Sequence, residues 1–381
     1  MLPEGWNREE LGTVASFASG NTPSKQNTAY WGGDMPWISA KDLKRPVMSN
    51  SIDTLSDDGA AVAKLASPGS VLILVRGMTI LKDIPVALAG RRLAFNQDVK
   101  CLSGRRGVEN RYLALALTAK KRAIMRLVNT ANHGTGRLDT DLLKSLLIEF
   151  PNSAEQQKIV ELVSTWDQAI ETVDKLIETA RAQKTALMQQ LLTGKRRLPG
   201  FEGAWRTFSF SDAFTVSNDK SKQVPKGEYE QAGDWPIVDQ GQGRVAGFTS
   251  NRRPRTDLPL IVFGDHTRAV KWIDTPFCPG ADGTQILKPK PCFDPKFAYY
   301  LLQSISLPNL GYSRHMRELK EREFRAPECA NEQAAVSDLL DGAVEEVVAL
   351  AKQRECFEIE KRALMQQLLT GKRRVKVEEP A

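Results

Sequence analysis

The twelve residues ALMQQLLTGKRR occur twice in this chain, at residues 186–197 and again at residues 363–374, 177 positions later. The same offset relates Glu155-Gln156 to Glu332-Gln333, so the two copies match in length without a gap. Self-similarity at a fixed offset is the sequence signature of a repeated structural unit. We therefore expect one element to be built twice, each copy beginning at a Glu-Gln pair and ending at a Lys-Arg-Arg cluster.

Each copy has the hydrophobic periodicity of a long helix. Apolar residues recur at alternating spacings of four and three, which is the pattern of a coiled-coil seam. The first series is Ile159, Val163, Trp166, Ile170, Val173, Ile177, Ala180, Leu187 and Leu191, with Lys184 at the one missing position. The equivalent positions of the second copy, two of them basic, are Val336, Leu340, Ala343, Val347, Leu350, Arg354, Phe357, Lys361, Leu364 and Leu368. Neither copy contains proline, and Gly194 and Gly371 stand where glycine commonly ends a helix. The pattern predicts two helices of about 38 residues, roughly 57 Å long at about 1.5 Å per residue.

A single helix of this kind would leave its apolar stripe in water, so we expect the two copies to cover each other. The connecting segment is long enough for the second helix to run antiparallel to the first, which would give a rod with an internal pseudo-two-fold axis. Lys184 and Lys361 fall on the seam in both copies. Two interpretations remain open for them: their ammonium groups extend to solvent, or they contact a partner or a phosphate near the end of the rod.

A basic cluster follows each helix, Lys195, Arg196 and Arg197 after the first and Lys372, Arg373 and Arg374 after the second. Positive charge at this position complements the helix dipole. Two identical clusters at equivalent ends would also suit a binding surface for DNA or for a protein subunit. The sequence does not choose between these explanations.

Composition indicates a folded, mildly basic protein. The chain has 381 residues, 41% of them hydrophobic, and a net charge of +7. The excess lies mainly in residues 1–150, with 20 Lys/Arg against 14 Asp/Glu. A basic balance fits a partner that carries phosphates. Five cysteines without C-x-x-C spacing indicate a reducing compartment. The sequence shows no signal peptide and no apolar run long enough to span a membrane. We therefore expect a soluble cytoplasmic protein.

The two segments outside the helices repeat an order of signals, although their sequences differ. Each has an early tryptophan, a Gly-Asp turn into a short strand, an apolar strand, a Gln-bearing strand, a short helix and a polar loop. In the first segment these are Trp6 and residues 33–38, 71–77, 95–99, 110–128 and 132–136; in the second they are Trp205 and residues 233–238, 260–265, 283–287, 295–306 and 312–316. Short strands bounded by Gly and Pro predict two mixed α/β domains.

At this point the chain resembles the specificity subunit of type I restriction–modification systems. The resemblance covers the whole chain and is carried by the order of its parts. Its motifs are Gly20-Asn21-Thr22-Pro23-Ser24-Lys25, residues 31–38 (WGGDMPWI), Lys41-Asp42-Leu43, Phe150-Pro151 and Ala326-Pro327 before the Glu-Gln pairs, and the helix end at residues 187–194. The family usually has a Pro-Leu-Pro-Pro run before Glu-Gln, whereas this chain reads FPNSA and APECA, so the local loop is expected to differ.

The resemblance implies an α+β fold in which two target-recognition domains, residues 1–150 and 198–328, are separated by two long antiparallel helices, residues 151–197 and 329–381. Each domain of such a subunit reads one half of a split double-stranded DNA target, and the helices set the spacer. The helices also dock two modification subunits, which methylate adenine with S-adenosylmethionine, and ATP-dependent restriction subunits join that core. The chain itself is expected to need no cofactor and no metal.

No catalytic constellation is evident in the sequence. There is no Walker-type phosphate loop and no Asn-Pro-Pro-aromatic run, and residues 241–247 (GQGRVAG) fit a turn better than a dinucleotide loop. Asp98-Val99-Lys100 and Asp42-Leu43-Lys44 match a D-x-K nuclease fragment without an evident second carboxylate, and the three histidines have no metal-ligand spacing. An enzyme with its own activity and a coiled-coil scaffold without DNA specificity remain the alternatives to a DNA-reading subunit.

DNA-contact candidates are Lys, Arg, His and small polar residues on expected loops, because these side chains bind phosphates and base edges. In the first domain they are Ser24, Lys25, Asn27, Tyr30, Arg76, Arg105, Arg106, His133 and Arg137. In the second they are Lys220, Lys222, Gln242, Arg244, Arg252, Arg253, Arg255, His266, Arg268, Arg314 and His315. For each of them a solvated surface residue is the competing interpretation. Trp37, Trp166 and Trp235 are expected in the core.

Overall fold

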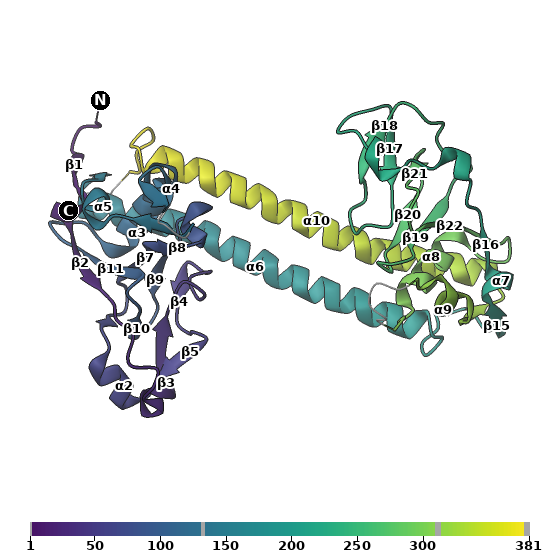
Figure 1. Ribbon diagram of the computed structural model, residues 1–381, viewed down its shortest axis with the longest axis horizontal. Coiled ribbons are helices and arrows are strands. Elements are labelled where there is room, and N and C mark those ends of the chain that lie inside the picture. The colour runs from purple at the N-terminus through teal and green to yellow at the C-terminus, as the bar shows by residue number, and fades with distance from the viewer. Residues whose placement is uncertain (1, 131–133, 309–313, 377–381) are drawn as a thin grey trace. The chain divides into compact units, whose positions relative to one another are not determined.

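A computed structural model describes residues 2–130, 134–308 and 314–376 (Figure 1). The chain divides into two compact units: unit 1 comprises Met1–Thr172 with Arg354–Ala381, and unit 2 comprises Val173–Gln353. Each unit therefore holds one mixed α/β domain together with adjoining parts of both long helices. The described helices include none that is both long and apolar enough to cross a bilayer.

Unit 1 contains short strands in four sheets and small helices around one large core and a smaller one at Trp37, Leu55 and Ala94. In spatial order the sheets are β1 (Asn7–Glu10) with β14 (Leu147–Phe150); β2 (Ala15–Ser19), β11 (Val99–Gly104), β7 (Val71–Leu74), β9 (Val86–Ala89) and β4 (Val47–Met48); β5 (Asp53–Leu55), β3 (Trp31–Ile38), β10 (Leu93–Phe95) and β6 (Leu65–Ala66); and β12 (Val128–Thr130), β13 (Gly136–Leu138) and β8 (Arg76–Gly77). The helical segments are α1 (Leu11–Val14), η1 (Thr28–Tyr30), α2 (Asp57–Val62), η2 (Thr79–Leu81), α3 (Asn110–Ala119), α4 (Lys121–Met125) and α5 (Thr140–Lys144).

Unit 2 contains three sheets built in the same way. In spatial order they are β15 (Trp205–Ser209) with β23 (Glu323–Pro327); β16 (Phe214–Val216), β22 (Thr284–Pro289), β19 (Leu260–Gly264) and β20 (Val270–Ile273); and β18 (Gly247–Thr249), β17 (Trp235–Val238) and β21 (Cys278–Pro279). The helical segments are α7 (Phe210–Ala213), η3 (Lys220–Lys222), η4 (Lys226–Glu228), α8 (Pro295–Ser304) and α9 (Met316–Lys320).

The two domains share the same arrangement of their central strands. The order β2-β11-β7-β9 in unit 1 corresponds to β16-β22-β19-β20 in unit 2, and β5-β3-β10 corresponds to β18-β17-β21. In both units the equivalent pair, β3 with β10 and β17 with β21, is parallel within an otherwise mainly antiparallel set. Helices α3 and α8 contact equivalent strands of the larger sheet. The repeated order of signals in the sequence thus reflects a repeated fold.

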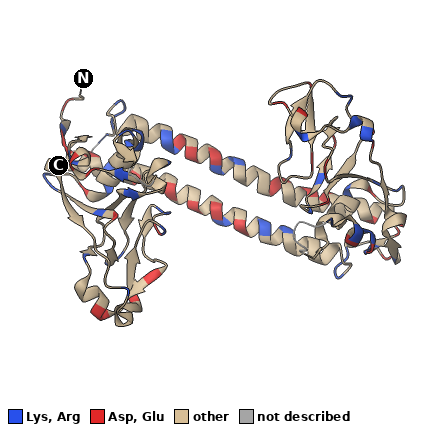
Figure 2. Ribbon diagram, in the orientation of Figure 1, with Lys and Arg blue, Asp and Glu red and all other residues tan. Residues whose placement is uncertain are grey.

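The long helices α6 (Ser153–Leu191) and α10 (Ala330–Leu368) have 39 residues each and begin and end 177 positions apart. In unit 1 the start of α6 shares a core with the end of α10, through Ile159 and Val163 on one helix and Met365 and Leu368 on the other. In unit 2 the end of α6 shares a core with the start of α10. The two helices are therefore antiparallel, and their charged residues are distributed along both (Figure 2).

The coiled-coil seam contains an aromatic pair and an ion pair in unit 1. Trp166 and Phe357 meet edge to face, with ring centroids 5.6 Å apart and planes at 74°. Lys361 Nζ lies 2.5 Å from Asp167 Oδ1, so this seam lysine bonds to the facing helix. Lys184 is half-buried, and the position equivalent to Asp167 in the second copy is Val344. The seam is thus chemically asymmetric although the backbone repeats.

The ends of the repeat are joined by two equivalent Arg-Glu contacts. Arg197 at the end of the first copy donates two hydrogen bonds to Glu332 (2.9 and 2.5 Å), and Arg374 donates two to Glu155 (2.7 and 2.8 Å). Both carboxylates are buried, at 1% and 2% exposure. The third residue of each basic cluster is therefore a structural partner of the opposite helix, whereas Lys195, Arg196, Lys372 and Arg373 are exposed.

The glutamine of each Glu-Gln pair fastens its helix to the neighbouring domain. Gln156 is fully buried; its amide donates to the carbonyls of Gly107 and Pro151, and its oxygen accepts from the Glu109 N–H. Gln333 makes the corresponding bonds to Cys292, Pro327 and Asp294. The Glu-Gln motif therefore lies at the junction between domain and helix. Both junctions use the same buried glutamine bonds, which explains why the motif occurs in both copies.

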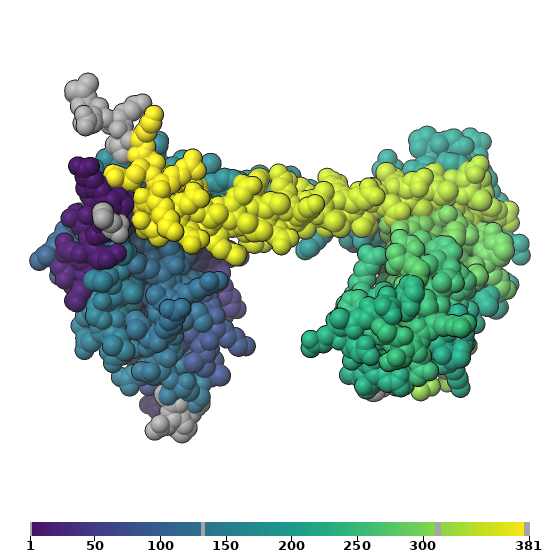
Figure 3. Space-filling model, turned by 90° about the horizontal axis from the view of Figure 1, so that it is seen from above, coloured from purple at the N-terminus to yellow at the C-terminus, as the bar shows by residue number. Residues whose placement is uncertain are grey.

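A glycine with a left-handed backbone follows each long helix, and the N-terminal segment packs near one of them. Gly194 and Gly371 have φ of +70° and +67°, as expected for glycines that end helices. A Cβ on Gly371 would lie 2.2 Å from Pro3 Cγ, and Arg374 Nη1 donates to the Glu4 carbonyl, so the N-terminal segment lies against the end of α10 in unit 1 (Figure 3). The predicted fold class, α+β with two mixed domains and two long antiparallel helices, is confirmed.

Three local predictions need correction. The helix expected at residues 110–128 is two helices, α3 and α4, which meet at Lys120. The Gln-bearing strand expected at residues 95–99 is a turn between β10 and β11: Asn96 binds both the N–H and the side chain of Asp98, which closes the turn. Trp37 is buried, as expected, whereas Trp166 and Trp235 are only half-buried.

Candidate nucleic-acid interface

Two candidate arginines of unit 1 are neighbours across a β ladder. Arg76 on β8 and Arg137 on β13 are directly opposite each other, and both side chains are exposed. Within the described part of the chain, no carboxylate lies at ion-pair distance from either guanidinium. Like charges placed opposite each other destabilise a ladder unless an anion compensates them. Three carboxylates, Asp98, Asp139 and Asp141, line the same depression as this pair.

The same edge of unit 1 is hollowed. A depression of about 390 Å³ lies there, and its charged lining is balanced. The lining includes Arg76, Lys100 and Arg137, the carboxylates Asp98, Asp139 and Asp141, and Gln97. Burial, and then the nearby Lys144, lowers the pKa of Lys100. Gln97 accepts a hydrogen bond from the Thr22 hydroxyl at 2.8 Å, which connects the depression to the loop that carries Ser24 and Lys25.

The loop from Ser24 to Tyr30 is held by aromatic and backbone contacts. Lys25 Nζ lies 5.9 Å from the centroid of Trp31, a cation–π distance, and the Ser24 carbonyl accepts from the Trp31 indole at 3.1 Å. Asn27 caps η1 by accepting from the Ala29 N–H. Ser24, Lys25 and Asn27 are exposed and Tyr30 is half-buried. This loop can present polar groups from a fixed position.

Equivalent backbone bonds identify the corresponding edge of unit 2. In unit 1 the Val75 N–H donates to the Asp98 carbonyl, and Val75 accepts from the Leu138 N–H. In unit 2 the Asp265 N–H donates to the Gly283 carbonyl, and Asp265 accepts from the His315 N–H. Asp265 thus occupies the position of Val75.

The candidates next to these positions are equivalent as well. His266 follows Asp265 as Arg76 follows Val75, and Arg314 precedes His315 as Arg137 precedes Leu138. The candidates were chosen separately in two domains of different sequence, yet these four fall on one equivalent edge. That edge is the candidate nucleic-acid interface of each domain.

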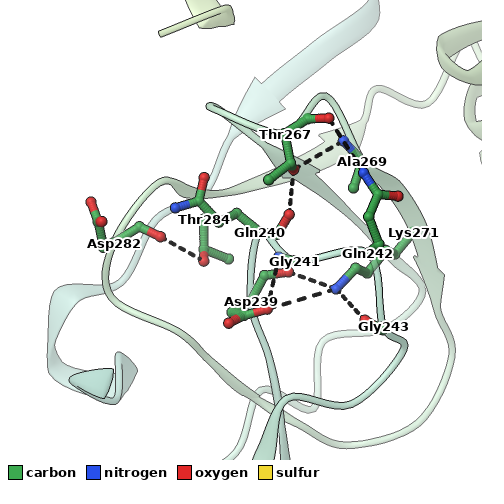
Figure 4. A network of polar contacts seen from close by, with 10 residues as sticks. All are labelled: Asp239, Gln240, Gly241, Gln242, Gly243, Thr267, Ala269, Lys271, Asp282 and Thr284. Atoms are coloured by element: carbon green, nitrogen blue, oxygen red, sulfur yellow. Dashed lines mark hydrogen bonds and ion pairs between the residues drawn. The ribbon is translucent and has the colours of Figure 1, made fainter. Parts of the chain in front are cut away.

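In unit 2 a polar network joins two loops of this edge (Figure 4). The Thr267 hydroxyl donates to the Gln240 carbonyl, and Gln242 Nε2 lies 3.5 Å from the Thr267 carbonyl. Arg268, in the same turn as Thr267, has a left-handed backbone (φ +60°) and donates to the Leu307 carbonyl. A non-glycine residue in this conformation is strained, and such residues gather at functional sites.

Some candidates have structural partners inside unit 2. Arg255 is 3% exposed and bonds to Asp257 and Ser217; its guanidinium lowers the pKa of Asp257 to about 2. His315 is fully buried, with Nδ1 at 2.9 Å from the Asp265 carbonyl. Arg252 pairs with Glu228 at 3.1 Å. Arg255 and His315 therefore stabilise the domain from within.

The remaining candidates are dispersed. Arg105 and Arg106 lie beyond the opposite end of β11 from Gln97, near the start of α6, and Arg106 pairs with Glu9. Lys220 and Arg253 are exposed and Lys222 is half-buried. His133 lies outside the described residues. DNA contact by any of the candidates remains a prediction.

The D-x-K fragment at residues 98–100 lies in the unit 1 depression, and there the sequence analysis missed two carboxylates. Asp139 and Asp141 line the same depression as Asp98 and Lys100. Asp139 caps α5 by accepting from two backbone N–H groups, and these bonds lower its pKa. No group of three metal-binding side chains that could hold an ion occurs among the residues that the structure describes.

Other residues of the interface also escaped the sequence analysis. Gln97 lies in a stretch that the sequence predicts as a strand, and neither Lys100 nor Lys271 is among the predicted DNA contacts. A signal was available for Lys271, since a lysine at an inward position of the strand Val270-Lys271-Trp272-Ile273 must find buried acceptors.

The chain thus contains two domains of related fold, each with a polar edge and each joined to segments of both long helices. Residues 3–181 match the family described as "Type I restriction modification DNA specificity domain". The resemblance to type I specificity subunits stated from the sequence motifs is thereby confirmed for this part of the chain.

Curated relatives carry the same designation. The chain is 29% identical over 211 residues to the specificity subunit of the type I restriction enzyme EcoR124I/EcoR124II of Escherichia coli, covering 55% of this chain and 49% of that protein. It is 26% identical over 273 residues to the MjaIX specificity subunit of Methanocaldococcus jannaschii, covering 69% of this chain and 60% of that protein. These matches thus span about half to three-fifths of the relatives' length.

Solved structures support the fold along nearly the whole chain. A type I restriction–modification S subunit from M. genitalium superposes with a TM-score of 0.61 at 15% identity, covering 95% of this chain and 96% of that one. A chain from a structure on complex assembly and conformational transition of the type I R-M system gives a TM-score of 0.60 at 16% identity, covering 97% and 98%.

Proposed function

We propose that this chain is the DNA-reading specificity subunit of a type I restriction–modification complex. Each domain reads one half of a split, asymmetric target in double-stranded DNA, and the chain itself carries no catalysis. The observation that supports this most directly is the equivalent polar edge, with Arg76 and Arg137 in unit 1 and His266 and Arg314 in unit 2. The same fold thus offers different side chains at the same place.

The helices fit the second requirement of a bipartite reader, which is a fixed separation. Half-sites on one face of DNA recur about every 34–36 Å, so two readers need a defined distance and rotation. A flexible linker would not define either. The buried Gln156 and Gln333 fix each domain to its helix, and the seam contacts fix one helix against the other. In this proposal the helix length sets the spacer.

The repeat also fits two copies of one protein partner. Leu162 and Leu339 lie at equivalent positions of α6 and α10 and remain 37% and 43% exposed. The exposed pairs Lys195-Arg196 and Lys372-Arg373 are equivalent in the same way. We assign these surfaces to two modification subunits that bind S-adenosylmethionine, with ATP-dependent restriction subunits joining the complex. The complex would act in the cytoplasm.

Methylation mapping tests the proposal. The gene is expressed together with its modification subunit in cells that lack other adenine methylation, and the methylated sites are read by long-read sequencing. The expected result is one split, asymmetric motif that disappears when this chain is omitted. Methylation without a split motif, or a motif unaffected by omission, would favour a scaffold without specificity, and methylation or cleavage by the isolated chain would favour an enzyme.

A further inference from the structure

One loop on the edge of unit 2 combines exposed side chains with a rigid support. It comprises residues 239–246, between β17 and β18, and includes Gly241 and Gly243. Gln242, Arg244 and Val245 are exposed, the last at 43%. A segment with two glycines has many conformations open to it in isolation, so its shape must come from its contacts.

The principal contact is a buried lysine beneath the loop (Figure 4). Lys271 on β20 is 9% exposed, and its Nζ donates to the carbonyls of Asp239 at 2.7 Å and Gly243 at 2.6 Å. The Asp239 carboxylate lies 3.9 Å away. A buried ammonium is costly unless it is fully hydrogen-bonded. Here its acceptors are two carbonyls of one loop, four residues apart, so satisfying the lysine also fixes the loop.

A second set of contacts joins the start of the loop to the adjacent turn. The Gln240 carbonyl accepts from the Thr267 hydroxyl, and its side-chain oxygen accepts from the His266 N–H at 3.1 Å. Gly283 has a left-handed backbone (φ +62°), which favours glycine, and the end of the Gln240 side chain lies where a Cβ would be. Asp239 Oδ1 accepts from the Gly241 N–H at 2.8 Å. Residues 239–243 are thus held on both sides.

The exposed side chains above this support have few competing partners. Arg244 lies 3.5 Å from Asp274, with the two side chains 73% and 53% exposed. Such surface pairs contribute little and exchange readily for a stronger anion or acceptor. Gln242 reaches Thr267 only at the 3.5 Å limit of a hydrogen bond. Both can turn toward a ligand without disturbing the core.

We propose that Gln242 and Arg244 are base-reading side chains of the second recognition domain, and that Lys271 is the positioning residue that holds their loop in the reading conformation. This inference rests on the proposed function. The ligand is the major-groove edge of double-stranded DNA, where glutamine pairs with adenine N6 and N7 and arginine with guanine O6 and N7. An adenine and a guanine are therefore expected within the half-site that this domain reads.

The test uses the full chain assembled with its modification subunits and reads the methylated motif for the native protein and for Gln242→Ala, Arg244→Ala, Lys271→Met and Lys271→Arg. The matched control is Arg317→Ala, a substitution of an exposed arginine in the same unit. Each alanine variant should relax one base position of one half-site, with roughly tenfold lower discrimination there, and leave the other half-site unchanged. Lys271→Met should relax the same positions, and Lys271→Arg should restore them in part.

The results distinguish failure of the proposed function from failure of the assignment of this loop. If the native complex methylates no split motif, the proposed function itself fails. If the native motif is split but Gln242→Ala and Arg244→Ala both leave it unchanged, or if they weaken both half-sites equally, the assignment of this loop is overturned. If Lys271→Met lowers the melting temperature without relaxing any base position, the lysine is a stabilising residue only.

Discussion

Replacing Gln333 by leucine tests the junction between the second domain and α10. Leucine has a similar volume and fills the buried site, but it removes three hydrogen bonds, two donated to the carbonyls of Cys292 and Pro327 and one accepted from the Asp294 N–H. Each such bond contributes about 0.5–1.5 kcal/mol, and the three backbone groups remain without these partners. We therefore expect a loss of about 3 kcal/mol in the free energy of unfolding.

Urea-induced unfolding of the isolated full chain, followed by tryptophan fluorescence, gives this free energy at 25 °C. Gln156→Leu should cost a similar amount, because Gln156 makes the equivalent three bonds in unit 1. The control is Gln366→Leu on an exposed position of α10, which should change stability by less than about 0.5 kcal/mol. If Gln333→Leu behaves like the control, the buried glutamine does not hold the junction and the structural explanation of the repeated Glu-Gln motif fails.

Three further predictions concern the core, the interface and acid stability. Leu340→Ala removes a fully buried side chain of the unit 2 core and should cost about 3 kcal/mol in urea unfolding; a loss below about 1 kcal/mol would mean that this part of the α6–α10 seam is not closely packed. Arg76→Ala and Arg137→Ala should each weaken binding of target and non-target duplex alike and lower the slope of log binding constant against log salt by about 1, measured by fluorescence anisotropy; an unchanged slope would exclude phosphate contact. Arg255 lowers the pKa of Asp257 to about 2, so the ionised carboxylate stabilises unit 2 fully above its usual pKa near 4 and loses this effect as the pH falls toward 2. Asp257→Asn should therefore flatten the decline of the melting temperature between about pH 4 and pH 2. A decline as steep as in the native chain would contradict the assignment.

The long helices could be predicted from sequence because their signals are local. Alternating spacings of four and three, the absence of proline and a final glycine each act within a few residues. The observed helices, Ser153–Leu191 and Ala330–Leu368, lie inside the segments 151–197 and 329–381 that the sequence indicates. The repeat itself predicted that two elements of equal length would pair. Which residues meet across the seam is harder to predict from the sequence, because Lys361 and Asp167 pair although they lie 194 residues apart.

For the interface, the sequence predicts the types of residue involved but not which of them lie next to one another. Arg76 and Arg137 were chosen as separate loop cations, and their adjacency depends on a ladder between β8 and β13 that no local pattern specifies. Arg255 and Arg314 were indistinguishable in sequence, yet one is buried and the other is exposed. The sequence predicts a strand at residues 95–99, but whether such a short run is a strand or a turn depends on its contacts, and here Asn96 closes a turn with its side chain.

The central claim, that helix length fixes the distance between two readers, is tested most directly by shortening both helices together. Deleting residues 169–175 from α6 and 347–353 from α10 removes one heptad from each, about 10 Å at about 1.5 Å per residue, and retains the phase of the seam. Methylation mapping of the reassembled complex should give both half-sites unchanged with a spacer shorter by about three base pairs, at about 3.4 Å per pair. A spacer of the original length in a complex that still methylates would contradict the account.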